Sequence, residues 1–133
     1  MKKKLLLLIS LFIVNFVSAQ ATATMVDDAP FNYADVEIRP EFPGGYNELL
    51  SFIGKNFKLA DDYEGFGGVL KVAFIIEVDG SITNVKVVKD LGGGTGAEAK
   101  RVISLSPKWS VGEYGGKKVR VLYELPIKIA GQG

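Results

Sequence analysis

The sequence predicts an α+β domain in which two helices pack on one face of a three-stranded antiparallel sheet. Two observations support this prediction. From Gly68 to Ile129 the pattern runs strand, tight turn, strand, helix and strand, and a separate helical stripe precedes it. Apolar residues at every second position predict strands, whereas spacings of three and four predict helices. Strands joined by a tight turn are antiparallel, and the first of them is expected to be central.

The first long strand and its return form a predicted hairpin. Asp79-Gly80 supplies the positive φ that a two-residue turn needs. The return strand, Ser81 to Lys89, changes the parity of its apolar residues after Ile82, which predicts a β-bulge near Thr83-Asn84. Alternate apolar residues place one face of the first strand in the core: Leu70, Val72, Phe74, Ile76 and Val78.

Two helices are predicted on either side of this hairpin. The first covers Tyr46 to about Phe57, and the second begins at a capping box, Thr95 to Glu98, and ends at Ser106-Pro107. Their apolar stripes are Tyr46, Leu49, Leu50, Ile53 and Phe57 in the first helix and Ala99, Val102 and Ile103 in the second.

The last strand has one apolar and one largely polar side. Pro126 lies within it and cannot donate to a ladder, so we expect an edge strand whose proline nitrogen faces away from its neighbour. Arg120, Leu122 and Glu124 share the parity of Pro126 and are expected to point their backbone groups outward. Such an edge is either guarded by charge or open to an added strand. The inward side carries Val119, Val121, Tyr123, Leu125, Ile127 and Ile129.

The first nineteen residues are typical of a cleaved signal peptide. Three lysines precede the apolar stretch Leu5 to Val17, and Val17-Ser18-Ala19 supplies small residues for cleavage. Thirteen helical residues rise only about 20 Å, against about 30 Å for a bilayer core, which disfavours the alternative of an uncleaved anchor. We therefore expect a signal peptide at 1–19, a flexible leader at 20–35 and a domain at 36–130.

Composition argues against enzymes and nucleic-acid binders. The chain has no His and no Cys, so the usual general base, thiol nucleophile, nitrogen metal ligand and disulfide are missing. Without residues 1–19, 13 basic and 15 acidic residues give a net charge of −2, which disfavours phosphate contacts. Asp61-Asp62 with Glu64 allows a calcium site, but the twelve-residue loop pattern is absent. We expect no cofactor, metal or small-molecule substrate.

Two further features have competing interpretations. Gly92, Gly94 and Ala97 satisfy a dinucleotide fingerprint, but they follow the second arm of an antiparallel hairpin in a small domain, which favours a simple connection to the helix. Trp109 either anchors a partner or fills one end of the core, and its position between Pro107 and Gly112 favours the core.

The chain resembles the C-terminal domain of the TonB family, the periplasmic part of an energy transducer that contacts outer-membrane transporters. The resemblance runs from about Val36 to Ile129 and rests on the order and spacing of its motifs. These are Phe42-Pro43-Gly44-Gly45, Gly68 to Phe74 leading to Asp79-Gly80, Pro107-Lys108-Trp109 with Gly112, and Val119-Arg120-Val121 leading to Leu125-Pro126-Ile127.

The resemblance implies a non-enzymatic periplasmic domain for energy-coupled transmembrane transport. In the family, a short transporter segment adds to the last strand, which assigns partner binding here to Arg120, Val121, Leu122, Tyr123 and Glu124. Leu59 and Ala60 stand where the family commonly has Tyr-Pro, a region near the receptor-binding surface of family members. The resemblance therefore implies that Leu59 and Ala60 also lie near the partner. The alternative is a self-associating structural module, such as a homodimer formed through Ile75, Val88 and Leu122 on the helix-free face.

Overall fold

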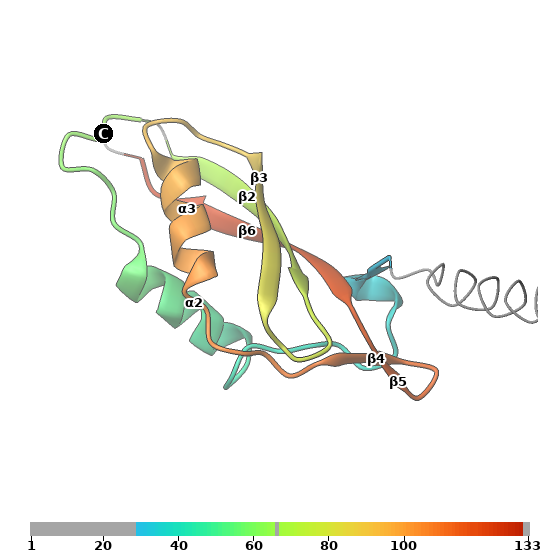
Figure 1. The fold of residues 1–133 in the computed structure, drawn as a ribbon. Helices are drawn as coiled ribbons and strands as arrows, with labels where there is room; N and C mark the ends of the chain where they lie inside the picture. The colour runs from blue at the N-terminus through green and yellow to red at the C-terminus, as the bar shows by residue number, and fades with distance from the viewer. Residues whose placement is uncertain (1–28, 66, 132–133) are drawn as a thin grey trace, which may run out of the picture.

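The computed structural model describes residues 29–65 and 67–131. The expected signal peptide and residues 20–28 of the expected leader lie outside this range. Figure 1 shows a four-stranded sheet in the order β1-β6-β2-β3, with a separate two-stranded sheet, β4-β5, at one end. The elements are β1 (Phe31–Asn32), η2 (Tyr33–Asp35), α2 (Tyr46–Asn56), β2 (Gly68–Ile76), β3 (Ile82–Lys89), α3 (Thr95–Ser104), β4 (Gly112–Tyr114), β5 (Lys117–Val119) and β6 (Val121–Ile129).

The α+β class and the central position of β2 are confirmed. β2 pairs antiparallel with both β3 and β6, and both helices lie on one face of the sheet (Figure 1). The core lies between this face and the helices, where alternate residues of each strand meet the helical stripes. Its fully buried members include Leu49, Leu70, Val72, Phe74, Ile76, Val102, Ile103, Val121 and Leu125.

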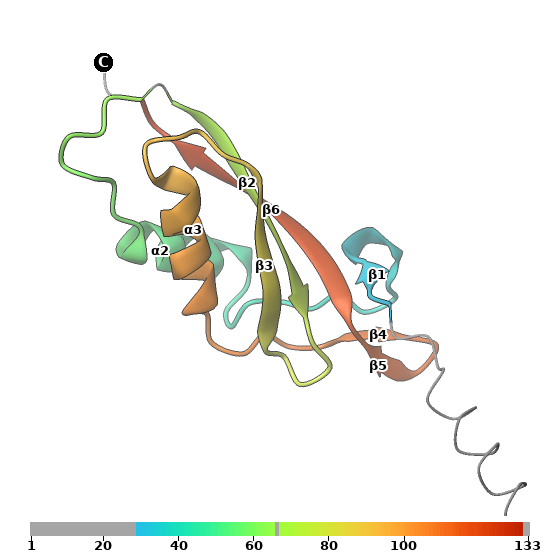
Figure 2. The same cartoon turned by 45° about the horizontal axis from the view of Figure 1, so that its top comes forward.

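The prediction of a purely antiparallel three-stranded sheet is wrong. β1 adds a fourth strand, parallel to β6, with Phe31 opposite Val121 and Asn32 opposite Leu122. Figure 2 shows β1 beside the start of β6. Residues 31–35, which the sequence places in a flexible leader, therefore form β1 and the 3-10 turn η2. A strand of two residues is too short to produce a periodic signal.

The hairpin between β2 and β3 forms, but with a longer turn than predicted. The Glu77 N–H donates to the Ser81 carbonyl at 2.8 Å, so Val78, Asp79 and Gly80 make a three-residue loop with Gly80 at φ +87°. The predicted bulge is confirmed, because the register shifts between Ala73 and Ile75. A second shift, at Lys71 and Val72, was not predicted.

The helix α2 buries a narrower stripe than predicted. Leu49 and Ile53 are buried, whereas Tyr46 and Leu50 keep 52% and 44% of their surface exposed. The Phe52 ring instead packs on Phe42, with ring centroids 5.4 Å apart. The buried stripe of α2 is therefore limited to the side that carries Leu49 and Ile53.

The predicted capping box of α3 is wrong. Gly94, in the left-handed conformation, precedes the helix, and Thr95 donates its hydroxyl to the Gly92 carbonyl rather than accepting from Glu98. The cap is Asp90, whose carboxylate accepts the backbone N–H of Gly92 at 2.9 Å and that of Gly96 at 3.1 Å. Hydrogen bonds from these N–H groups lower the pKa of Asp90, and the bond from Gly92 has the largest effect. The glycine cluster thus bends the chain back so that an upstream carboxylate reaches the helix start.

We expect Asp90→Ala to destabilise the domain by about 1 kcal/mol at pH 7, because the Gly96 N–H in the first turn of α3 and the Gly92 N–H in the preceding loop lose their acceptor. The folded-state pKa lies below the unfolded value, so this contribution is complete above about pH 4 and is lost as the pH falls through the folded-state pKa. Urea unfolding of parent and variant should therefore give free energies that converge at acidic pH. A difference that stays constant on acidification would contradict the carboxylate cap.

The predicted last strand is divided between two sheets. β5 ends at Val119 and pairs with β4, Arg120 lies between, and β6 begins at Val121. Gly115 and Gly116, both with positive φ, form the tight turn of the β4-β5 hairpin. The alternation of apolar residues continues through this junction, so it conceals the change of sheet.

Trp109 fills the core, as predicted. Only 6% of its surface is exposed, and its indole N–H donates to the Ser106 hydroxyl at 2.9 Å. Its ring lies edge-on to Phe42, Phe74 and Tyr123, with centroids 5.6 to 5.8 Å apart. The residue therefore closes one end of the core and does not serve as an exposed anchor.

Candidate functional site

The outer edge of β6 faces away from β2. The position of Pro126 indicates which residues of β6 point their backbone N–H and C=O groups toward this edge. Pro126 lies opposite Lys71 and has no N–H, so these residues form a pair that exchanges no ladder bonds. The pairs of Glu124 with Ala73 and of Leu122 with Ile75 have the same parity. The Phe31 N–H donates to the Arg120 carbonyl at 2.9 Å. The Arg120 carbonyl therefore points away from β2, as expected for a residue at an even-numbered position like Pro126.

β1 covers only the beginning of this edge. Its pairing stops at Leu122, and among the described residues no strand pairs with β6 beyond that point on this side. A hollow of about 400 Å³ lies where η2 turns away, between Tyr33 and Ala34 on one side and Leu122 and Glu124 on the other. The backbone groups of Glu124, Pro126 and Lys128 follow along the edge.

Three of the predicted partner-binding residues are engaged within the domain. The Arg120 guanidinium donates to the Glu77 carboxylate at 2.8 Å, and this bond lowers the pKa of Glu77. Val121 is fully buried. Tyr123 packs on Tyr33 at 4.6 Å between ring centroids, and burial raises its pKa to about 12. The side chains of these three residues contact other parts of the domain. At the outer edge of β6, only their backbone groups are therefore placed to meet a partner.

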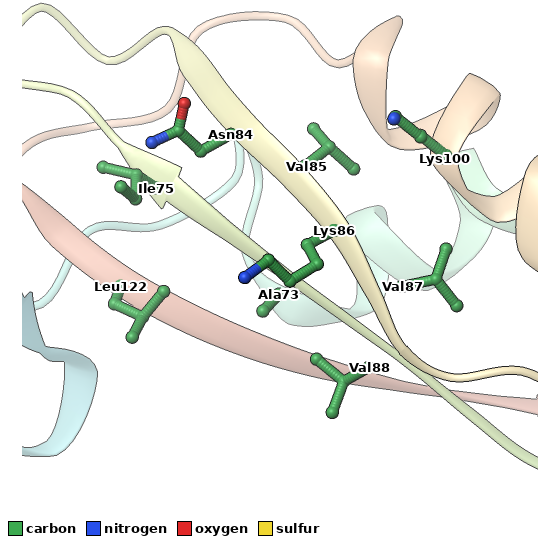
Figure 3. A pocket seen from close by; sticks show the side chains of 9 residues that line it. All are labelled: Ala73, Ile75, Asn84, Val85, Lys86, Val87, Val88, Lys100 and Leu122. Atoms are coloured by element: carbon green, nitrogen blue, oxygen red, sulfur yellow. The ribbon is translucent and has the colours of Figure 1, made fainter.

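Leu122 and Glu124 are exposed on the helix-free face. The Glu124 carboxylate lies 3.9 Å from the Lys71 ammonium, and Leu122 retains 38% of its surface. Figure 3 shows Leu122 near Ala73 and Ile75, with Val88 farther along β3, and all four residues line a hollow of about 700 Å³. Ile75 is nevertheless 94% buried, so the exposed apolar surface here comes mainly from Leu122 and Val88.

Leu59 and Ala60 have different surroundings. Leu59 lines a hollow of about 350 Å³ beside the second half of β6, whereas Ala60 is exposed in the following turn, where its carbonyl accepts the Tyr63 N–H. We call the first feature the Leu59 hollow. It is lined by Ile53, Gly54, Phe57, Leu59, Ile127, Lys128, Ile129 and Ala130.

An ion pair on α3 anchors the chain segment that walls the Leu59 hollow. The Glu98 carboxylate accepts the Lys58 N–H at 2.8 Å and pairs with Arg101 at 2.6 Å. Arg101 also donates to the Asn56 carbonyl at 2.7 Å. The pKa of Glu98 is lowered to about 2, and the hydrogen bond from Arg101 is the largest cause. Residues 56–58 are thereby held to α3 on either side of Phe57.

Sequence reasoning did not identify three residues of this region. Lys128 has the parity of Leu122 and Glu124, so the alternation that selected those residues could also have selected it. Gly54 interrupts the helical stripe of α2, which is a weak signal by itself. Phe57 was assigned to the core, yet it also lines the Leu59 hollow.

Within the described ranges, no group of three or more acidic side chains is placed to hold a metal ion. The same part of the chain contains no helix with the length and apolar character needed to cross a bilayer.

The fold is a small α+β domain with a partly unpaired sheet edge flanked by apolar hollows, a geometry that can accept an added strand. Residues 61–128 match the family described as Gram-negative bacterial TonB protein C-terminal, and the chain belongs to this family. No curated protein and no solved structure matched the chain. The family consists of non-enzymatic, envelope-associated interaction domains of energy-coupled transport. Leu59 and Ala60 precede the matched range.

Proposed function

We propose that this domain binds an extended segment of an outer-membrane transporter in the periplasm by adding it as a strand to the outer edge of β6. The observation that carries the proposal is the edge from Glu124 to Lys128, which is unpaired within the described residues and has regular outward parity. An added strand gains main-chain hydrogen bonds there and side-chain contacts from the hollows on both faces. Family membership supplies the class of partner.

The opposite edge of the sheet, on β3, is less suited to strand addition. β3 carries two register shifts, and bulges interrupt the regular row of donors and acceptors that an added strand needs. Lys86 and Lys89 are exposed on this strand, as is common for guarded edges. β6 instead runs in unbroken register with β2 from Val121 to Ile129.

We expect Glu124→Pro to weaken peptide binding while the domain stays folded, because proline removes an outward N–H and no ladder bond to β2. Glu124→Ala is the matched control, since it removes the carboxylate and keeps the N–H. The probes are short overlapping peptides covering the periplasmic segments of the transporters of the source cell, titrated by calorimetry. Equal affinity of parent and Glu124→Pro, or absence of binding by the parent, would exclude strand addition at this edge.

Export places the domain where such a partner is accessible. We propose cleavage after Ala19, which gives a mature chain starting at Gln20. The intact mass of the protein purified from its native envelope should correspond to residues 20–133. A full-length species that requires detergent would instead support an uncleaved inner-membrane anchor.

A self-associating structural module is the second candidate, favoured by the apolar hollow around Leu122 and Val88 (Figure 3). Static light scattering distinguishes the two functions. A stable dimer that binds no transporter peptide would favour self-association, whereas a monomer that binds peptide would favour strand addition.

A further inference from the structure

The Leu59 hollow lies on the helix side of β6 and reaches its outer edge. Ile53 and Phe57 line it from the helix side, and Ile127 and Ile129 line it from the core-facing side of β6. Lys128 also lines it, although its parity places its side chain on the other face and its backbone groups at the outer edge. The hollow is therefore continuous with the row of groups that an added strand would pair with.

Strand geometry decides which side chain of an added strand would enter this hollow. Residues directly opposite one another in neighbouring strands point to the same face. A peptide residue opposite Ile127 would therefore point to the helix side, toward Phe57 and Leu59. Its neighbours, opposite Pro126 and Lys128, would point to the helix-free face.

Gly54 gives independent evidence that this space is left open. A glycine inside a helix costs about 1 kcal/mol relative to alanine. Gly54 does not have a positive φ, and a Cβ added there would meet no atom within 4 Å. Neither backbone conformation nor close packing within the described chain therefore calls for glycine. An alanine or larger side chain would, however, reduce the hollow.

We propose that the Leu59 hollow is a specificity pocket that accepts one apolar side chain, of the size of Val, Leu or Ile, from the transporter segment paired with β6. This inference rests on the proposed function and adds a sequence preference to it. The apolar lining disfavours a charged side chain, since Leu59, Phe57 and Ile127 offer it no hydrogen-bond partner. The pocket thus fixes the register of the peptide. Main-chain pairing alone specifies the register poorly, because Pro126 provides no N–H at this point of the edge.

Filling the pocket tests the inference. Gly54→Leu should lower the affinity of the peptide identified by titration roughly tenfold or more, because its apolar side chain can no longer be buried. Gly54→Ala should lower the affinity less, because one methyl group fills less of the hollow than a leucine side chain, and both variants should keep the circular dichroism spectrum of the parent. A peptide with Ala in place of the inserted side chain should bind Gly54→Leu and parent equally, whereas Asp at this position should weaken binding to the parent.

The outcomes separate this inference from the proposed function. If Glu124→Pro loses affinity and Gly54→Leu binds like the parent, strand addition stands and the specificity pocket is wrong. If neither substitution changes affinity, or the parent binds no peptide, both fail. If Gly54→Leu instead converts a dimer to a monomer in light scattering without peptide, the occupant is a second copy of the chain, and the inference is overturned.

Discussion

Trp109→Ala is expected to destabilise the domain by about 3 to 5 kcal/mol, the range observed for truncation of a large buried aromatic residue. The indole is 94% buried and meets the rings of Phe42, Phe74 and Tyr123. Removing it leaves a cavity bordered by α2, β2 and β6. Urea unfolding followed by circular dichroism gives the change directly.

The matched control is Trp109→Phe, which keeps an aromatic ring and loses the hydrogen bond to Ser106. It should retain most of the stability. A loss below about 1 kcal/mol for Trp109→Ala would mean that the side chain lies outside the core, since surface substitutions rarely exceed about 0.5 kcal/mol.

Gly80→Ala is expected to cost about 3 kcal/mol, although it adds one methyl group. Gly80 has φ +87°, and a Cβ there would lie 2.3 Å from the Trp109 carbonyl oxygen. Backbone strain and overpacking each contribute on the order of 1 to 3 kcal/mol. The Trp109 N–H donates to the Gly80 carbonyl at 2.9 Å, so the two segments cannot separate without losing this bond.

Gly92 provides the control for the Gly80 substitution. It has a similar φ of +81°, but a Cβ there would meet nothing within 4 Å. Gly92→Ala should therefore show the strain alone, a smaller loss, in the same thermal or urea unfolding experiment. Equal losses for the two variants would mean that contact with Trp109 contributes nothing.

The parts of the fold that follow from local periodicity could be predicted from the sequence. Four alternating residues, Leu70, Val72, Phe74 and Ile76, specify β2, and the glycine after Asp79 specifies a hairpin. Val78, which the same alternation assigned to the core, instead lies in the turn and is 45% exposed. The helical stripes place α2 and α3 within a residue or two of their ends. These signals are predictable because each depends on residues that are neighbours in the chain.

Features that depend on distant contacts could not be predicted. Thr95 and Glu98 fit a capping box, but the left-handed backbone at Gly94 lets Asp90 reach the helix start first. Tyr46 belongs to the α2 stripe by spacing, yet it stays 52% exposed and borders a hollow that Trp109 and Tyr123 also line.

The candidate site shows the same division. Pro126 made it possible to predict which backbone groups of β6 point outward, because a residue without an N–H cannot donate to the neighbouring strand. The pairing of Phe31 with Val121 and the hollow beside Leu59 depend on chain segments that are far apart in sequence. Arg120 was assigned to the partner, but its ion pair with Glu77 becomes visible only when β2 and β6 are paired.

Amide hydrogen exchange, measured by NMR with and without saturating transporter peptide, tests strand addition at β6 most directly. The account predicts that the N–H groups of Glu124 and Lys128, which face away from β2, exchange rapidly in the free domain and become protected in the complex. The N–H groups of Leu125 and Ile127 should be protected in both states. Protection confined to β3, or unchanged exchange at Glu124 and Lys128 in a saturated complex, would contradict it.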